Sequence, residues 1–176
     1  MRDLRLLALL FLLVGMVSAP GNADAQWQEF NAADGSYSFS MPQKPEENER
    51  QAEGYGFPSH TLFYVTNTRE IRFIFAGRTK YHADAKVPVR SELEANANNF
   101  AKAMKGKLSA ERFFTWTLDG RSYDAFESFA ESQGGRFRQL YIIDGNVVYA
   151  VIAGPETDDN KAAIGRFISS LRLRKP

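Results

Sequence analysis

Hydrophobic and polar residues alternate along residues 36–41, with aromatic and methionine side chains on one side and serines on the other. This period of two predicts a half-buried strand that ends at Pro42. Residues 46–56 are polar, rich in glutamate and glycine, and without periodicity, so they predict a surface loop. Two further segments, at about residues 60–65 and 71–76, predict strands that pair as a hairpin across a polar turn.

A capping box at residues 91–94 predicts the start of a helix, because Ser91 can accept a hydrogen bond from an amide of the first turn. Apolar residues then recur on one helical face, and Gly106 predicts the end of the helix. This face comprises Leu93, Ala97, Phe100, Ala101 and Met104. A second stripe predicts a closing helix and comprises Ile164, Phe167, Ile168 and Leu171. Acidic residues suit the positive end of its dipole, namely Glu156, Asp158 and Asp159.

Four aromatic and β-branched segments lie between residues 112 and 153, separated by pairs of residues that favour tight turns. These pairs are Asp119-Gly120, Gly134-Gly135 and Asp144-Gly145. The order of three strands, a helix, four strands and a helix predicts an α+β fold with an antiparallel sheet of about six or seven strands. Several strands are apolar on both faces, so we expect an α/β/α sandwich with helices on both faces. Because βαβ alternation is missing, the pattern argues against a parallel nucleotide-binding sheet.

Residues 1–25 predict a signal peptide with a basic start, an apolar run at 6–17 and an A-x-A motif at its end. We expect cleavage between Ala25 and Gln26, because a cut after Ala19 would leave a proline first. The apolar run of twelve residues is shorter than the roughly twenty that cross a bilayer. The sequence therefore predicts a periplasmic or secreted protein without a stable transmembrane anchor.

Composition narrows the chemistry of the predicted single domain, residues 26–176. The chain contains no cysteine, which excludes disulfides, thiolate chemistry and a lipoprotein signal. Its 22 basic and 21 acidic residues are interspersed and give a net charge of +1, so nucleic-acid binding is not expected. The basic end of the chain, at residues 172–175, is interpreted as a solvated tail after the closing helix.

Three segments resemble the Mog1/PsbP-like group of small α/β/α sandwich proteins. Residues 37–45 (YSFSMPQKP) are similar to the group's strand-then-proline opening, residues 135–153 to its final pair of long strands, and residues 166–173 to its closing helix. The resemblance spans most of the predicted domain and implies its fold. Members of the group are accessory subunits, small-GTPase binders or chaperone-like adaptors, and the resemblance carries over no catalytic residue.

Candidate chemistry depends on two histidines, His60 and His82. His82 and Asp84 could supply two metal ligands, whereas a catalytic zinc site needs three and a structural one four. A hydrolase could combine Ser91, His82 and Asp84, but Ser91 is already explained as a helix cap and no nucleophile elbow is present. Two acidic pairs could resemble glycosidase carboxylates, yet their predicted place in first helical turns explains them. The pairs are Glu92 with Glu94 and Asp158 with Asp159.

The pair Gly134-Gly135 and the single glycines at 120 and 145 lie between strands, so they predict hairpin turns and no nucleotide cofactor. The adjacent rings of Phe113 and Phe114 point to opposite faces of one strand. A hydrophobic groove for a partner or ligand would form if one of these faces were incompletely covered.

These observations favour an exported, non-enzymatic binding or accessory module of the cell envelope. Its expected partner is a protein or an envelope component, and no catalytic, cofactor or metal residue is assigned. One alternative is a small hydrolase or metal-dependent enzyme that uses His82 and nearby acidic residues. Another is a carrier of an apolar ligand.

Overall fold

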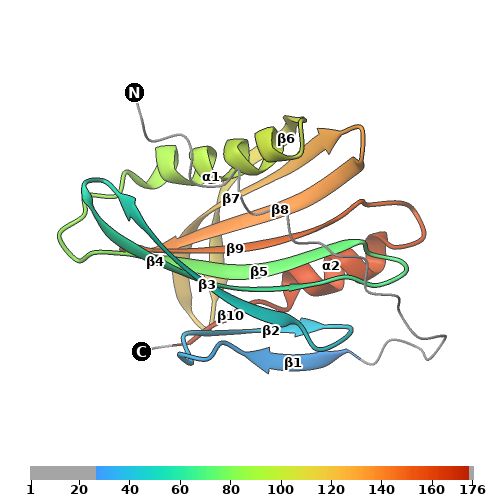
Figure 1. The fold of residues 1–176 in the computed structure, drawn as a ribbon, viewed down its shortest axis with the longest axis horizontal. Coiled ribbons are helices and arrows are strands. Elements are labelled where there is room, and N and C mark those ends of the chain that lie inside the picture. Colours follow the sequence, from blue (N-terminus) through green and yellow to red (C-terminus); the bar gives the residue numbers. More distant parts are fainter. Residues whose placement is uncertain (1–26, 175–176) are drawn as a thin grey trace.

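A seven-stranded antiparallel sheet forms the centre of the molecule (Figure 1). The computed structural model describes residues 27–174, so the predicted signal peptide and its cleavage site lie outside the described residues. Across the sheet, the strands are β3 (Glu46–Gly54), β4 (Phe57–Thr66), β5 (Phe73–Tyr81), β9 (Val147–Gly154), β8 (Gly135–Asp144), β7 (Arg121–Ser132) and β6 (Lys107–Leu118). The predicted β4–β5 hairpin and the four-stranded meander from β6 to β9 are both confirmed.

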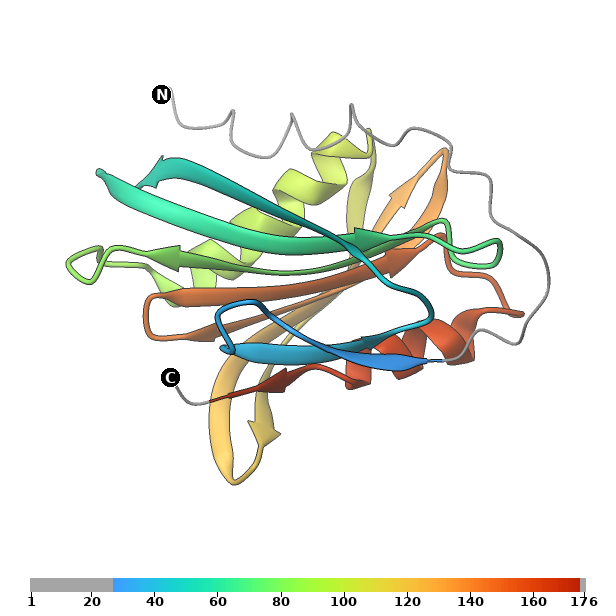
Figure 2. The same cartoon turned by 60° about the horizontal axis from the view of Figure 1, so that its bottom comes forward.

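Helices cover both faces of this sheet, as the sequence predicts (Figures 1 and 2). One face is covered by α1 (Val89–Ala103), and the other by α2 (Lys161–Ser169) together with a second, three-stranded sheet. The strands of this small sheet are β1 (Gln28–Asn31), β2 (Tyr37–Met41) and β10 (Arg172–Leu173). Neither helix is long and apolar enough to span a membrane, and no other α-helix occurs in residues 27–174.

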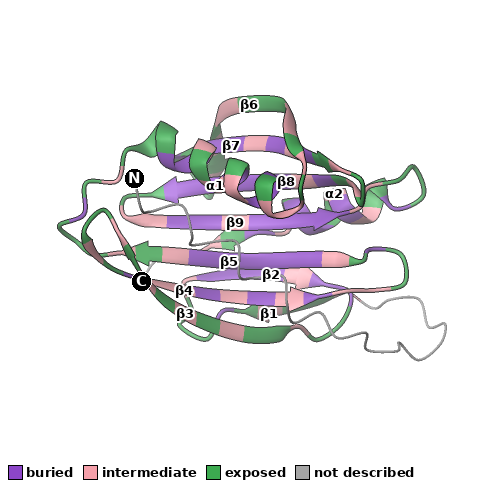
Figure 3. Ribbon diagram, turned by 45° about the horizontal axis from the view of Figure 1, so that its top comes forward, coloured by how far each residue is buried: buried purple, intermediate pink, exposed green. Residues whose placement is uncertain are grey.

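The large sheet therefore separates two hydrophobic cores. Leu93, Phe100 and Phe126 belong to the core under α1, whereas Phe39, Ile142 and Phe167 belong to the core under α2 and the small sheet. The central strands β9 and β8 contribute to both cores, which is why they are apolar on both faces. Figure 3 shows the resulting gradient, with buried residues concentrated in the central strands and exposed residues along β3.

The prediction of a loop at residues 46–56 is wrong, because most of this segment forms strand β3. Nine residue pairs join β3 to β4, from Glu46 opposite Val65 to Gly54 opposite Phe57. As an edge strand with no buried residue, β3 needs no apolar alternation, and its glutamates hinder edge-to-edge association. Backbone pairing rather than side-chain burial determines its structure.

The start of α1 also differs from the prediction. The helix begins at Val89 after an N-cap at Pro88, so Ser91 lies inside the first turn and caps nothing. Proline suits the start of a helix because it has no amide hydrogen to leave unsatisfied. At the other end, Lys105 rather than Gly106 adopts positive φ, and the Gly106 amide bonds to the carbonyl of Ala101.

The small sheet corrects two further expectations. Residues 36–41 do form a strand, but β2 pairs with β1 and β10 rather than with the large sheet. Arg172 and Leu173 are not part of a solvated tail, because they pair with Ser38 and Tyr37 of β2.

The acidic pair at residues 158–159 precedes α2 instead of lying in its first turn.

Candidate functional site

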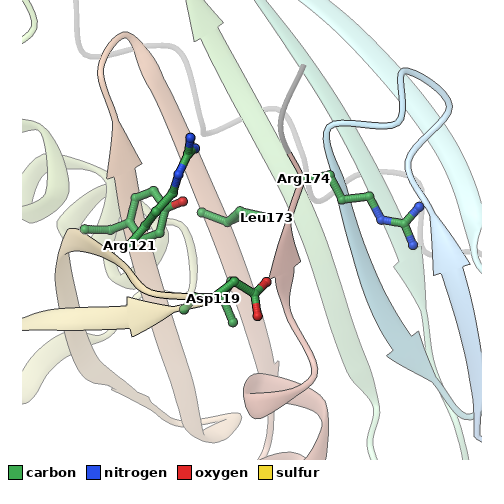
Figure 4. Close-up of a pocket in the computed structure, with 6 residues that line it drawn as sticks. Asp119, Arg121, Leu173 and Arg174 are labelled. Atoms are coloured by element: carbon green, nitrogen blue, oxygen red, sulfur yellow. The ribbon is translucent and has the colours of Figure 1, made fainter.

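A pocket of about 420 Å³ opens between β10 and the turn that joins β6 to β7 (Figure 4). Its volume falls within the range of small ligand sites, roughly 300 to 1,000 Å³. The residues that line it are Leu118, Asp119, Arg121, Tyr123, Leu173 and Arg174. They come from two separate parts of the chain, the first hairpin of the meander and the end that follows α2.

Local sequence determines both walls of the pocket. On one side, Asp119 and Gly120 have φ of +50° and +76°, the conformation of a two-residue type I′ turn, and they place Leu118 opposite Arg121. On the other side, the buried Leu171 anchors the end of α2, and the chain then runs beside β2 as β10. The pocket lies where these two independently specified segments approach each other.

The pocket combines an apolar interior with charged margins. Leu118 and Leu173 are half-buried and Tyr123 is buried, whereas Asp119 and Arg121 are exposed. Figure 4 shows the side chains of Leu173 and Arg174 extending in opposite directions, with Leu173 on the side of Arg121. Such a site can hold an apolar group while a guanidinium binds a neighbouring carboxylate.

Arg174 reaches toward the small sheet. Its guanidinium lies 3.3 Å from Glu29 of β1, and both side chains are about half exposed. An exposed ion pair of this kind contributes little to stability. A ligand carboxylate could therefore replace Glu29 without a large loss of folding free energy.

The two histidines lie outside this pocket and have separate partners. His82 lies 3.5 Å from Asp84 and stacks on Phe57, with ring centroids 5.2 Å apart. His60 lies 3.4 Å from Glu49 on the neighbouring strand. Within residues 27–174, no three His, Cys, Asp or Glu side chains are grouped as a metal site would need.

Glu92, one member of the acidic pair at residues 92 and 94, has hydrogen-bond partners that the sequence does not predict. Glu92 is only 5% exposed, and its carboxylate accepts hydrogen bonds from the phenols of Tyr55 and Tyr81 and from the Asn96 side chain, the last at 2.7 Å. Burial together with this carboxylate raises the pKa of both phenols well above the usual range. Glu94 instead faces Arg90 on the surface, at 3.3 Å. Glu92 therefore ties the β3–β4 turn and the end of β5 to α1.

The rings of Phe113 and Phe114 do point to opposite faces of β6, and both are partly covered by other side chains. Phe113 packs on Phe126 with ring centroids 4.5 Å apart and lies under the guanidinium of Arg90. Phe114 lies under the guanidinium of Arg112, 4.4 Å from the ring centroid. The pocket described above begins farther along β6, at Leu118.

An ion pair between a buried arginine and an exposed aspartate connects the small sheet to the large one. Arg78 of β5, 7% exposed, pairs with Asp34 in the β1–β2 turn. Burial alone would raise the pKa of Asp34, but hydrogen bonds from Ser36 and the charge of Arg78 outweigh burial and lower it. No local pattern reveals this pair, because its members are 44 positions apart in the sequence.

Comparison with known proteins supports the fold. No family model matches the chain, and no curated protein matches it by sequence. The solution structure of cyanobacterial PsbP (CyanoP) from Synechocystis sp. PCC 6803 is similar, with a TM-score of 0.53 at 13% sequence identity. The similarity covers 90% of this chain and 99% of CyanoP. The chain has the PsbP-like fold.

The resemblance inferred from three sequence segments is thus confirmed at the level of fold. A Pseudomonas aeruginosa protein of unknown function, PA94, described as a putative regulator, is also similar, with a TM-score of 0.40 at 11% identity. That similarity covers 85% of this chain and 99% of the other. At these identities the PsbP-like likeness concerns the fold alone.

Proposed function

We propose that this PsbP-like protein is an exported, non-enzymatic binding module of the cell envelope, and that the pocket between β10 and the β6–β7 turn contacts its partner. The observation that carries the proposal is the composition of the pocket. Two leucines and a tyrosine provide apolar surface, and Arg121 provides an exposed positive charge beside them. Apolar surface next to an arginine is typical of the energetic centre of a binding interface.

The same composition favours binding over catalysis. Six residues line the pocket, and the only groups among them that could act as nucleophile or general base are the exposed carboxylate of Asp119 and the phenol of Tyr123, with no histidine, serine, cysteine or lysine beside them. His82, the residue on which the enzyme hypothesis depends, is absent from the lining. The charged margin also favours a partner that contacts the protein from outside over an apolar ligand that is fully enclosed.

Co-purification of the protein from its native envelope tests the proposal with two charge-reversal variants. Arg121→Glu should lose the partner, because it places a carboxylate beside the pocket. Lys86→Glu should retain it, because Lys86 is also exposed but lies in the loop before α1. Retention of the partner by both variants, with intact export and an unchanged melting temperature, would refute this binding site.

A second pair of variants tests the non-enzymatic part of the proposal. His60→Ala and His82→Ala should each complement a deletion strain as well as the parent does. If His82→Ala abolishes function while the melting temperature stays unchanged, the histidine-dependent enzyme hypothesis replaces the binding module.

A further inference from the structure

The free edge of β10 presents backbone hydrogen-bonding groups toward the pocket. β10 is an edge strand of the small sheet, and among the strands of residues 27–174 it pairs with β2 alone. The amide of Arg174 donates to the carbonyl of Ser36 at 2.9 Å, so Arg174 and Ser36 form a hydrogen-bonded pair. Because such pairs recur at every second position of an antiparallel ladder, Arg172 and Ser38 form one as well. Between them, Leu173 opposite Tyr37 is a non-hydrogen-bonded pair. The N–H and C=O of Leu173 therefore point to the open side of β10.

The register of β2 supports this assignment. The carbonyl of Tyr37 accepts a hydrogen bond from the amide of Ala32, at 2.9 Å on the β1 side of β2. Tyr37 thus directs its backbone away from β10, as a non-hydrogen-bonded partner of Leu173 must. Because Leu173 also lines the pocket, its free backbone groups and the apolar hollow lie at the same place.

We propose that an extended peptide segment adds to β10 as a fourth strand of the small sheet. This inference rests on the binding function proposed above. Its backbone exchanges two hydrogen bonds with Leu173. One apolar side chain of the segment enters the hollow formed by Leu118, Tyr123 and Leu173, and a neighbouring acidic side chain binds Arg121. In this mode the backbone pairing supplies affinity, while the pocket and the arginine supply specificity.

Charge complementarity identifies the acidic part of the partner. Arg121 is exposed and forms no ion pair with any residue from 27 to 174. Asp119 is the single acidic residue of the lining, and the side chain of Arg174 extends away from Arg121 toward Glu29, at 3.3 Å. The margin of the pocket therefore attracts a segment with negative side chains.

The edges of the large sheet are less suited to strand addition. β3 carries four glutamates, at positions 46, 47, 49 and 53, and no buried residue. β6 is interrupted by a bulge between Ser109 and Arg112, where Ala110 has φ of +49°. Edge charges and bulges both hinder pairing with another strand. By contrast, β10 has a hollow beside it.

Fluorescence anisotropy with a labelled, end-blocked peptide of alternating glutamate and valine tests the inference. Leu173→Pro removes the free amide of β10 but leaves the hydrogen bonds that Arg172 and Arg174 make with β2. Leu173→Ala is the matched control, because it removes the side chain and keeps the amide. We expect Leu173→Pro to bind about tenfold more weakly than Leu173→Ala. N-methylation of the peptide at one valine should weaken binding by a similar factor.

The outcomes separate this inference from the proposed function. Equal binding by Leu173→Pro and Leu173→Ala, at matching melting temperatures, would overturn strand addition. Undiminished binding of every N-methylated peptide would overturn it as well, whereas equal binding of a peptide with lysine in place of glutamate would overturn the assignment of an acidic partner. In those cases the pocket would remain the binding site if Arg121→Glu still released the native partner from the envelope preparation. Retention of that partner by Arg121→Glu would instead refute the binding site itself.

Discussion

At the scale of single residues, a buried arginine and a buried glutamate, Arg78 and Glu92, have different kinds of partner. Arg78 has a carboxylate partner, Asp34, across the gap between the two sheets. Glu92 has no cationic partner among residues 27–174, and three neutral donors surround it instead. Because a buried charge without hydrogen bonds is costly, both sets of contacts should matter for stability.

Asp34→Asn should destabilise the protein by on the order of 3 kcal/mol, because it leaves the buried guanidinium of Arg78 without a counter-charge. Chemical denaturation measures this change in the free energy of unfolding. Asp124→Asn serves as the control, since Asp124 is exposed on β7 and should change the free energy of unfolding by less than about 0.5 kcal/mol. Equal effects of the two variants would contradict the structural role of the Arg78–Asp34 pair.

The same ion pair should make stability depend on pH. The folded-state pKa of Asp34 is lowered, so its contribution is present above the unfolded pKa of about 3.9 and is lost as the pH falls through the folded value. The difference in stability between wild type and Asp34→Asn should therefore be constant near neutral pH and shrink below about pH 4. Comparison with the variant is necessary because Arg112 and Arg138 also overcome burial and lower the pKa of Glu127.

Glu92→Ala should cost about 2 to 3 kcal/mol, because the phenol of Tyr81 would lose a charged acceptor inside the protein. Glu94→Ala, on the exposed side of the same helix, should cost only about 0.5 kcal/mol. Thermal unfolding of both variants measures the contrast. A similar loss in both would show that the Tyr55–Glu92–Tyr81 contacts contribute no more than a surface ion pair.

At the scale of elements, glycine determines how closely a helix end and a strand can approach. A Cβ at Gly106 would collide with the carbonyl oxygen of Glu131 in β7. A Cβ at Gly165, inside α2, would meet only the end of the Arg138 side chain, at 3.9 Å. The two glycines thus occupy sites with opposite tolerance for a side chain.

Gly106→Ala should therefore destabilise the protein, since the backbone between α1 and β6 would have to move away from β7. Gly165→Ala should stabilise it by up to about 1 kcal/mol, because alanine favours the helix interior. Denaturant unfolding of the two variants gives the sign of each change. Destabilisation by Gly165→Ala would show that α2 packs more tightly than the structure indicates.

The closing helix depends on its buried stripe. Phe167 is 0% exposed and lies in the core under the small sheet, so Phe167→Ala should cost on the order of 3 to 5 kcal/mol. Lys161→Ala, at the exposed first residue of the same helix, should change stability by less than about 0.5 kcal/mol. An effect of Phe167→Ala within experimental error, measured by denaturant unfolding, would contradict the docking of α2 on the sheet.

At the scale of the whole molecule, the two helices and the small sheet cover a central sheet without any cysteine in the chain. Hydrophobic packing on both faces must therefore stabilise the domain without disulfides. This property does not restrict the compartment, so export is tested separately through the predicted signal peptide.

Processing between Ala25 and Gln26 should remove twenty-five residues from the exported protein. Intact-mass measurement of protein recovered from outside the cytoplasm tests this expectation, and Ala25→Leu should slow processing because it replaces the small residue before the cut. A full-length species as the only form outside the cytoplasm would contradict the predicted cleavage.

The sequence by itself determined the fold class, the meander and the buried faces of both helices. Apolar residues recur with a period of two along a half-buried strand and of about 3.6 along an amphipathic helix, so the two kinds of element can be distinguished. Asp119-Gly120 favours a turn through its own backbone preferences. Local interactions and side-chain burial therefore made these elements recognisable. Nine residues of β3 escaped recognition because an exposed edge strand has no apolar period to detect.

Only the tertiary structure decided where the candidate site lies. Arg174 resembles part of a charged tail, and Leu118 precedes an ordinary hairpin turn, so neither residue predicts a pocket on its own. They line one hollow because β10 pairs with β2 while the β6–β7 hairpin ends beside it. The pairings of Arg78 with Asp34 and of Glu92 with Tyr55 likewise join residues far apart in the sequence. Long-range contacts of this kind depend on how elements pack, which the period of a single segment does not encode.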